Sequence, residues 1–309
     1  MNIFLATLAA LSLFATPASY SPDEANNESL VHIPFDPPVN QPIRYMVEEI
    51  RDRQGTETRN GSIVTVEFQA TEDGYRADFV HSEAPGMDFL PDLPGMDRLS
   101  ELVRQPYSVR VSPAGEIIAL EDEERLIDRL SSAMDEITTG ADMPVEVAEA
   151  LRAYVQRVRD MPTQGRLEFI MQGVAPIVGL GDVELGLGEA LSVPIDLPTP
   201  FGPIPVTADL SLENIVDGVA LVTVRLNVPS DEFRTIVLNA IEQLAPSIPA
   251  ADMQRALTEN PISMMISETY YISVDHGTLV RYEREKVAST EAAANPVATR
   301  DAVVIVRLD

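Results

Sequence analysis

Apolar and polar residues alternate along several segments of the chain, and this period-2 pattern constrains the fold more than any other feature. Every second side chain is apolar in residues 62–70, and the same alternation resumes in residues 75–79 after an Asp-Gly pair at 73–74. Successive side chains of a strand point to opposite faces, and Asp-Gly is a frequent hairpin turn. The pattern therefore predicts a β-hairpin with one buried face.

Three more hairpins follow from the same kind of pattern. They span residues 107–120, 206–228 and 268–285, each with a glycine-containing turn near its middle. Residues 302–308 also alternate and predict a last strand, whereas the Ala/Thr/Asn-rich residues 288–300 read as a linker.

Helical spacing of apolar residues is confined to segments between the hairpins. It occurs in residues 122–137, 144–159 and 231–244, and more briefly near residues 99–103. Apolar residues at intervals of three and four mark one face of an amphipathic helix. Long strands combined with such grouped helices predict an α+β fold.

The order hairpin–helix–hairpin occurs twice, at about 43–120 and 185–286, which indicates a tandem duplication joined by two helices within about 122–160. We expect a large curved antiparallel sheet made from these two halves, with the helices packed on one of its faces. This single domain would span residues 42–309, preceded by an extended, proline-rich arm at residues 19–41.

Residues 1–18 form an uncharged apolar run that ends in Thr16-Pro17-Ala18. The run resembles a secretory signal peptide cleaved after Ala18, although it has no Lys or Arg before the apolar part. An N-terminal anchor and a cytosolic start remain as alternatives. No later segment has the roughly eighteen consecutive apolar residues of a membrane span, so we expect a periplasmic or extracellular mature chain without a transmembrane span.

Composition excludes several classes of function. The chain has no cysteine, which removes disulfides, thiolate nucleophiles, cysteine zinc sites and a lipid-modified cysteine. Its net charge of −27 argues against binding to nucleic acid or anionic lipid, because both need clustered Lys and Arg. Lys286 is the only lysine. Calcium binding would be the sharper explanation of the acidity, but no calcium-loop motif is present.

The exported start, the two meander halves and the intervening helices resemble the periplasmic lipoprotein-carrier superfamily. The stretch from Gly179-Leu180-Gly181-Asp182 to Pro203-Ile204-Pro205, followed by strand, Asp-Gly turn and strand, is similar to uncharacterised secreted bacterial proteins of duplicated β-architecture. The resemblance spans most of residues 42–286 and rests on layout. It implies a half-barrel sheet that holds acyl chains under a helical lid, and it assigns no functional residue.

The most unusual local sequence is Pro-Gly-Met-Asp at 85–88, repeated at 94–97. Around these repeats lie the large apolar side chains of Met87, Phe89, Leu90, Leu93 and Met96. Such a loop either folds onto the edge of the core or acts as a lid or docking patch over an apolar cavity. A second candidate is the segment LPTPFGPIP at 197–205, with Phe201 at its tip. We take these six residues as candidate ligand-binding residues.

No catalytic or metal motif is present. His32, His81 and His276 are far apart in sequence and lack metal-ligand spacing, and no G-x-S-x-G motif occurs. The glycines of residues 173–188 do not match a phosphate-binding loop. With no Trp and 6% aromatic residues, a sugar-binding cleft is also poorly supported. We therefore expect no catalytic residues, metal or cofactor.

Together these features predict an exported, non-enzymatic binding protein of the bacterial cell envelope. Its apolar concavity would take a lipid-like ligand or a lipoprotein segment. The alternative is an envelope protein-interaction or scaffold module without a small ligand, whose partner is another envelope protein. A hydrolase is a third possibility, which the absence of nucleophile and metal motifs disfavours.

Overall fold

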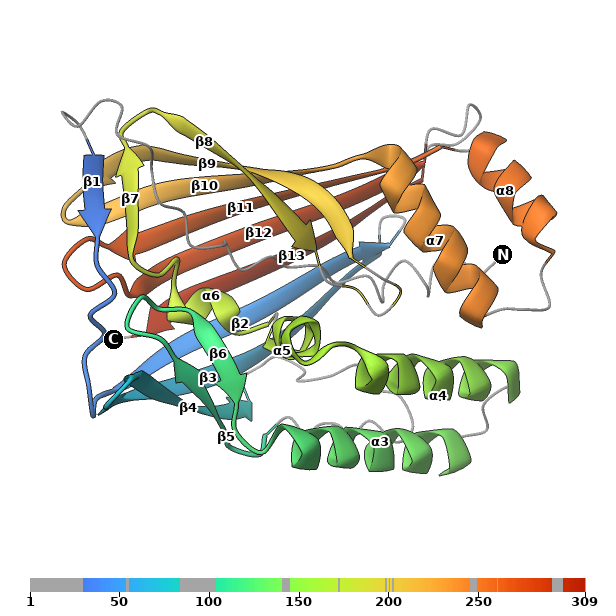
Figure 1. Ribbon diagram of the computed structural model, residues 1–309, viewed down its shortest axis with the longest axis horizontal. Helices are drawn as coiled ribbons and strands as arrows, with labels where there is room; N and C mark the ends of the chain where they lie inside the picture. The colour runs from blue at the N-terminus through green and yellow to red at the C-terminus, as the bar shows by residue number, and fades with distance from the viewer. Residues whose placement is uncertain are drawn as a thin grey trace.

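The computed structural model is dominated by one large, curved antiparallel sheet (Figure 1). It describes residues 30–53, 56–83, 104–140, 145–171, 173–197, 199, 201, 203–244, 249–259, 261–290 and 297–308.

Eleven strands make up the sheet in the described part of the chain. In spatial order they are β6 (Ile117–Leu120), β5 (Tyr107–Val111), β4 (Gly74–Glu83), β3 (Thr56–Thr71), β2 (Pro42–Arg53), β13 (Val297–Leu308), β12 (Leu279–Thr290), β11 (Ile262–Ser273), β10 (Val219–Val228), β9 (Ile204–Val216) and β8 (Ala190–Leu197). The predicted hairpins β3–β4, β5–β6, β9–β10 and β11–β12 are all confirmed. The mixed α+β class is confirmed as well.

The last strand, β13, lies at the centre of the sheet. Its residue Val303 pairs with Glu49 of β2 on one side and with Arg284 of β12 on the other. β13 therefore joins the strands of the first half to those of the second half into one continuous sheet. The predicted linker at 288–300 was too long, because β12 continues to Thr290 and β13 begins at Val297, where backbone pairing extends through both ends of that segment.

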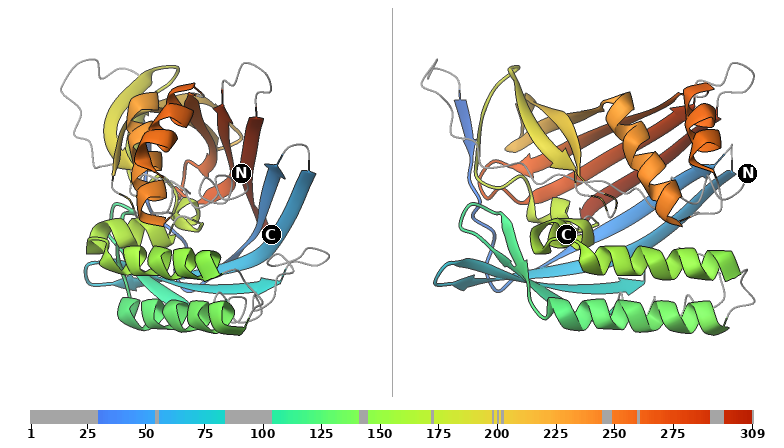
Figure 2. Two further views of the ribbon diagram at one scale, coloured as in Figure 1. Left: turned by 90° about the vertical axis from the view of Figure 1, so that its right-hand side faces the viewer. Right: turned by 45° about the vertical axis from the view of Figure 1, so that its right-hand side comes forward.

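Two of the observed helices, α3 (Glu123–Gly140) and α4 (Val145–Asp160), pack together, and α7 (Ser230–Leu244) corresponds to the third predicted helix. The sequence analysis missed α5 (Thr163–Met171), α6 (Ala175–Val178) and α8 (Ala250–Glu259). The helix α7 lies against β9 and β11, α6 against β12, and α5 against β6. Figure 2 shows these helices on the concave side of the sheet, toward which both of its edges curve.

The alternation of the sequence places a continuous apolar layer on the concave side. Leu212, Val222, Ile266, Ile305 and Val64 are all fully buried there, one from each of five different strands. Burial of such side chains stabilises the fold by about 25 cal/mol per Å² of apolar surface removed from water. No helix in the described ranges is long and apolar enough to cross a membrane.

Residues 30–41 run along one end of the sheet. They include β1 (Leu30–Ile33), which pairs with β7 (Val183–Gly186) in a separate two-stranded sheet. Beyond β1, the Phe35 ring meets Phe68 and Tyr75 edge-on, at centroid distances of 6.0 and 5.4 Å. Asn40 N–H donates to the Phe68 carbonyl at 2.7 Å. These contacts attach the arm to both halves of the sheet.

Candidate ligand-binding face

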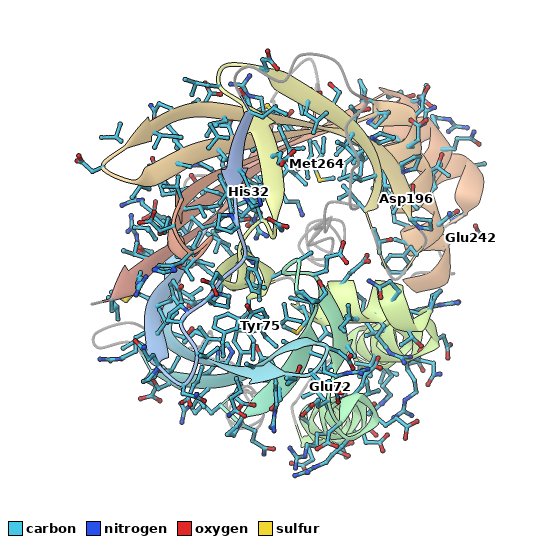
Figure 3. The ribbon with its side chains drawn as sticks, turned by 60° about the vertical axis from the view of Figure 1, so that its left-hand side comes forward. His32, Glu72, Tyr75, Asp196, Glu242 and Met264 are labelled. Atoms are coloured by element: carbon cyan, nitrogen blue, oxygen red, sulfur yellow. The ribbon has the colours of Figure 1, made fainter. Side chains whose placement is uncertain are left out.

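The concave face of the sheet is the candidate site, because it is the broad apolar surface on which the sequence hypothesis depends. Side chains on this face point inward, as Tyr75 and Met264 do in Figure 3, whereas Glu242 on α7 points away from the interior. Met264 is 4% exposed, in keeping with its inward position.

A small cavity lies on the second half of this face. Its walls include Val193 of β8, Leu210 of β9, Leu226 of β10 and Leu180, which precedes β7. Its volume is about 20 Å³, which is room for about one water-sized group. The cavity can hold a small terminal group of a ligand, but not an alkyl chain.

Two polar side chains of β11 also line the cavity. Glu268 is 6% exposed, and Tyr270, two residues along the same face, donates its hydroxyl hydrogen to Glu268 Oε2 at 2.8 Å. Burial raises the pKa of Glu268 above its usual range, while the charge of Arg284 and the neighbouring phenol groups act in the opposite direction. The cavity therefore joins an apolar wall to a buried carboxyl group.

The neighbouring strand β12 presents polar side chains beside this carboxyl group. The ladder pairs Glu268 with Arg284 and Tyr270 with Tyr282, and the two tyrosine rings lie 4.8 Å apart between centroids. Lys286, the next inward residue of β12, is 6% exposed. We call Glu268, Tyr270, Tyr282 and Arg284 the polar cluster. Sequence analysis missed it, although Glu268 interrupts the apolar face of an otherwise alternating strand.

The first half of the inner face carries an aromatic group instead. The Phe79 and Tyr107 rings stack with centroids 5.3 Å apart and planes inclined by 8°. His81 Nε2 lies 3.2 Å from the Tyr107 hydroxyl oxygen. Burial lowers the pKa of His81 to about 4, so this imidazole is neutral at pH 7. The group reads as packing and not as an acid–base site.

Five of the six predicted ligand-binding residues, Met87, Phe89, Leu90, Leu93 and Met96, lie outside the described residues. The sixth, Phe201, is 7% exposed. Its ring lies 6.5 Å from that of Tyr154 on α4, and its N–H donates to Thr199 Oγ1 at 3.1 Å. This ring connects the β8–β9 loop to a helix and does not line the small cavity.

The remaining histidines lie apart from the polar cluster. His32 Nε2 is 2.5 Å from Asp182 Oδ1 in an exposed pair between β1 and the segment before β7. His276 is exposed in the β11–β12 turn, and its carbonyl accepts a hydrogen bond from Asp36 N–H. Within the described ranges, no group of three or more His, Asp or Glu side chains is arranged to hold a metal ion.

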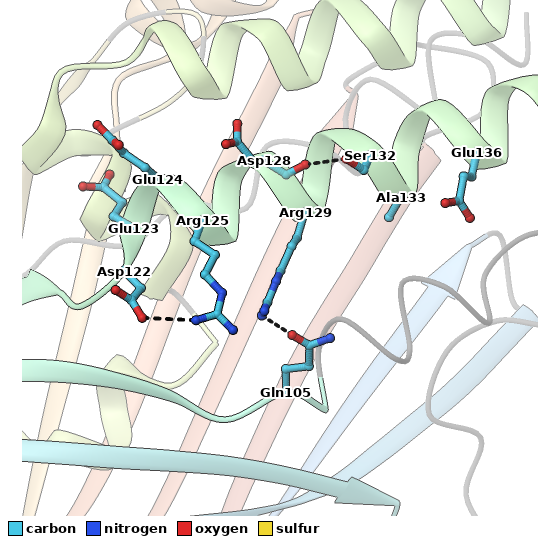
Figure 4. Close-up of a pocket in the computed structure, with 10 residues that line it drawn as sticks. All are labelled: Gln105, Asp122, Glu123, Glu124, Arg125, Asp128, Arg129, Ser132, Ala133 and Glu136. Carbon is cyan, nitrogen blue, oxygen red and sulfur yellow. Dashed lines mark hydrogen bonds and ion pairs between the residues drawn. The ribbon is translucent and has the colours of Figure 1, made fainter.

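A larger depression lies on α3 and is highly charged (Figure 4). It measures about 780 Å³ and is lined by residues of α3 and its N-terminal flank, such as Asp122, Arg125, Asp128 and Arg129, together with Gln105. These side chains pair among themselves, as Arg129 does with Gln105 and Arg125 with Asp122. Surface ion pairs of this kind contribute little free energy. The depression is a solvated surface and not a second site.

No protein-family model matches the sequence, and no curated protein matches it. Two solved structures are distantly similar. One is a structure of lipid–protein interactions in lipovitellin, with a TM-score of 0.42 and 8% identity over 87% of this chain. This chain spans 25% of the lipovitellin chain. The other is Rv2717c from M. tuberculosis, with a TM-score of 0.23 and 8% identity over 86% of this chain and 91% of that chain. No property is transferred from either structure.

Proposed function

We propose that this protein is an exported, non-enzymatic binding protein of the bacterial cell envelope, and that its concave face binds a lipid-like ligand or a lipoprotein segment. The observation that carries the proposal is the continuous apolar layer on the inner face of an eleven-stranded curved sheet. An apolar concavity with a few convergent polar groups is the usual form of a small-molecule site.

The arrangement of the helices supports the same proposal. The strong helix contacts are with β6, β9, β11 and β12, so the described helices line the concave side without forming a second full layer against the sheet. Apolar residues of the central strands, such as Val64 and Ile305, face the same interior. A ligand chain lying along these strands would bury apolar surface, which favours binding by about 0.8 kcal/mol per methylene group.

The alternative is an envelope protein-interaction or scaffold module without a small ligand. The small size of the described cavity, about 20 Å³, favours this alternative. In that case the loop at 84–97 or the segment at 197–205 would contact a protein partner.

Native mass spectrometry of the mature protein, purified from its own cell envelope and followed by organic extraction, separates the two functions. We expect a co-purifying lipid of defined mass. Ile195→Trp, which places a large ring on the inner face beside the cavity, should reduce the bound fraction. The matched control Asp196→Trp places the same ring on the exposed side of the same strand and should leave the bound fraction unchanged. A clean ligand-free mass of the wild-type protein would favour the interaction module.

The export part of the proposal rests on residues 1–18 and has its own test. We expect the envelope protein to begin at Ser19, which intact-mass measurement and N-terminal sequencing can detect. Recovery of the full-length chain in the cytosolic fraction would contradict export without affecting the proposal about the concave face.

A further inference from the structure

The inner face of β12 carries three hydrogen-bond donors in a row. Tyr282, Arg284 and Lys286 stand at alternate positions of the strand, so their side chains share one face with a spacing of about 7 Å. Tyr282 is fully buried and Lys286 is 6% exposed. Placing the only lysine and a neighbouring arginine on the inner face is notable in a chain whose net charge is −27.

The Tyr282 hydroxyl is the most informative of these donors. It is buried close to Glu268, and the charge of that carboxyl group raises the pKa of Tyr282 together with burial. Yet the hydroxyl makes no hydrogen bond of ordinary geometry to any described residue. A buried polar group without such a bond costs about 1–3 kcal/mol, so its persistence calls for an explanation.

The acidic groups of this region do not favour a cationic ligand. Glu268 already accepts the hydrogen bond of Tyr270 and faces Arg284 across the ladder. Its other ladder neighbour is Val224 of β10, which is apolar. Burial favours the neutral form of the carboxyl group, which weakens its attraction for a ligand amine. Donors, by contrast, are present on Tyr282 and Arg284.

We propose that the polar cluster of Glu268, Tyr270, Tyr282 and Arg284 binds the carboxylate end of a single-chain amphiphile whose alkyl chain lies along the apolar inner face. This inference rests on the proposed function and names the ligand class. The Arg284 guanidinium and the Tyr282 hydroxyl donate to the ligand carboxylate. The carboxylate end reaches the cavity that Glu268 and Tyr270 line, while the apolar chain contacts residues such as Leu210 and Leu226.

The test compares three probes of equal chain length on the delipidated mature protein: dodecanoate, dodecan-1-ol and dodecylamine. Calorimetric titration should show dodecanoate binding at least about tenfold more tightly than dodecan-1-ol, as expected for charge-assisted hydrogen bonds. Arg284→Met should bring dodecanoate down to the affinity of dodecan-1-ol. Tyr282→Phe, which keeps the ring and removes the hydroxyl, should weaken dodecanoate about fivefold.

Control variants come from the outer face of the same two strands. Arg281 and Tyr271 pair with each other across the ladder and point away from the cluster, so Arg281→Met and Tyr271→Phe should leave all three affinities unchanged. Glu268→Gln should not weaken dodecanoate, because it removes a carboxylate that competes for Arg284. A loss of affinity in Glu268→Gln equal to that in Arg284→Met would overturn the inference.

The remaining outcomes separate the inference from the proposed function. Equal binding of dodecanoate and dodecan-1-ol, with both changed alike by Arg284→Met, would overturn the carboxylate inference and leave the apolar site intact. Preference for dodecylamine would overturn it in the same way. Binding of none of the three probes would overturn the proposed function and this inference together.

Discussion

The carbonyl oxygen of Pro34 lies 1.9 Å from the point where a β-carbon on Gly277 would stand. Gly277 has a φ of 64° in the β11–β12 turn, a conformation that glycine adopts at no steric cost. The N-terminal arm can therefore lie directly on this turn, and Asp36 N–H donates to the His276 carbonyl at 3.1 Å. The contact fastens residues 30–41 to the second half of the sheet.

Gly277→Ala should therefore destabilise the protein beyond the backbone cost of a positive φ. The comparable turn of the β9–β10 hairpin contains Gly218, with a φ of 75° and no atom within 4 Å of a built β-carbon. We expect Gly218→Ala to cost about 1 kcal/mol and Gly277→Ala more than about 3 kcal/mol, because the arm must also move. Urea unfolding measures both, and equal losses would show that the arm does not press on this turn.

His81 should make the protein less stable in mild acid. Its pKa is lowered by burial to about 4, so the unfolded chain takes up this proton near pH 6.5 while the folded chain resists it. The contribution is complete above about pH 6.5 and is lost as pH falls toward 4, by up to about 3 kcal/mol in the free energy of unfolding.

Urea unfolding at pH 7 and pH 4.5 checks this expectation in wild type and in His81→Phe, a variant that can keep the stacking on Tyr107. The variant should lose less stability between the two pH values than the wild type. His276→Gln, in an exposed turn, should behave as the wild type does. The same pH dependence in His81→Phe and wild type would rule out the buried imidazole as its source.

Local patterns predicted most of the strands, because a hairpin is defined by residues close in sequence. The alternation around Asp73-Gly74 and Asp217-Gly218 is enough to specify pairing, register and the buried face of each hairpin. The position of β13 was not predictable in the same way. Its two ladders join Val303 to residues that are far away along the chain, and no local signal records such a partner.

The candidate site was less predictable than the fold for a related reason. Glu268 and Arg284 are sixteen positions apart in the chain and meet only because the β11–β12 register places them opposite each other. Acidic residues are so frequent in this sequence that one inward Glu carries little information by itself. The apolar loop residues drew attention instead, and Phe201, one of those chosen, is buried against Tyr154.

Phe201→Ala should lower stability even in the absence of a ligand. The ring is 7% exposed and packs near Tyr154, so its removal leaves a cavity between the β8–β9 loop and α4. Truncation of a buried Phe costs about 3 kcal/mol or more, whereas Phe201→Leu, which keeps most of the apolar volume, should cost about 1 kcal/mol. The measurement is urea unfolding of the delipidated protein. Unchanged stability with reduced ligand uptake would instead make Phe201 a ligand contact.

The apolar loop at 84–97 leads to the last prediction. If Met87 and Phe89 contact the ligand as a lid, then Met87→Asp and Phe89→Asp should abolish uptake of a lipid-like ligand, because a carboxylate next to an alkyl chain must be desolvated. Thermal unfolding of the delipidated variants should match the wild type if the loop does not pack in the core. Asp88→Asn, which changes the charge between these two positions without adding a carboxylate, is the matched control and should retain uptake. Normal uptake in both Asp variants would remove this loop from the binding site, while a large loss of stability in both would place its side chains in the core.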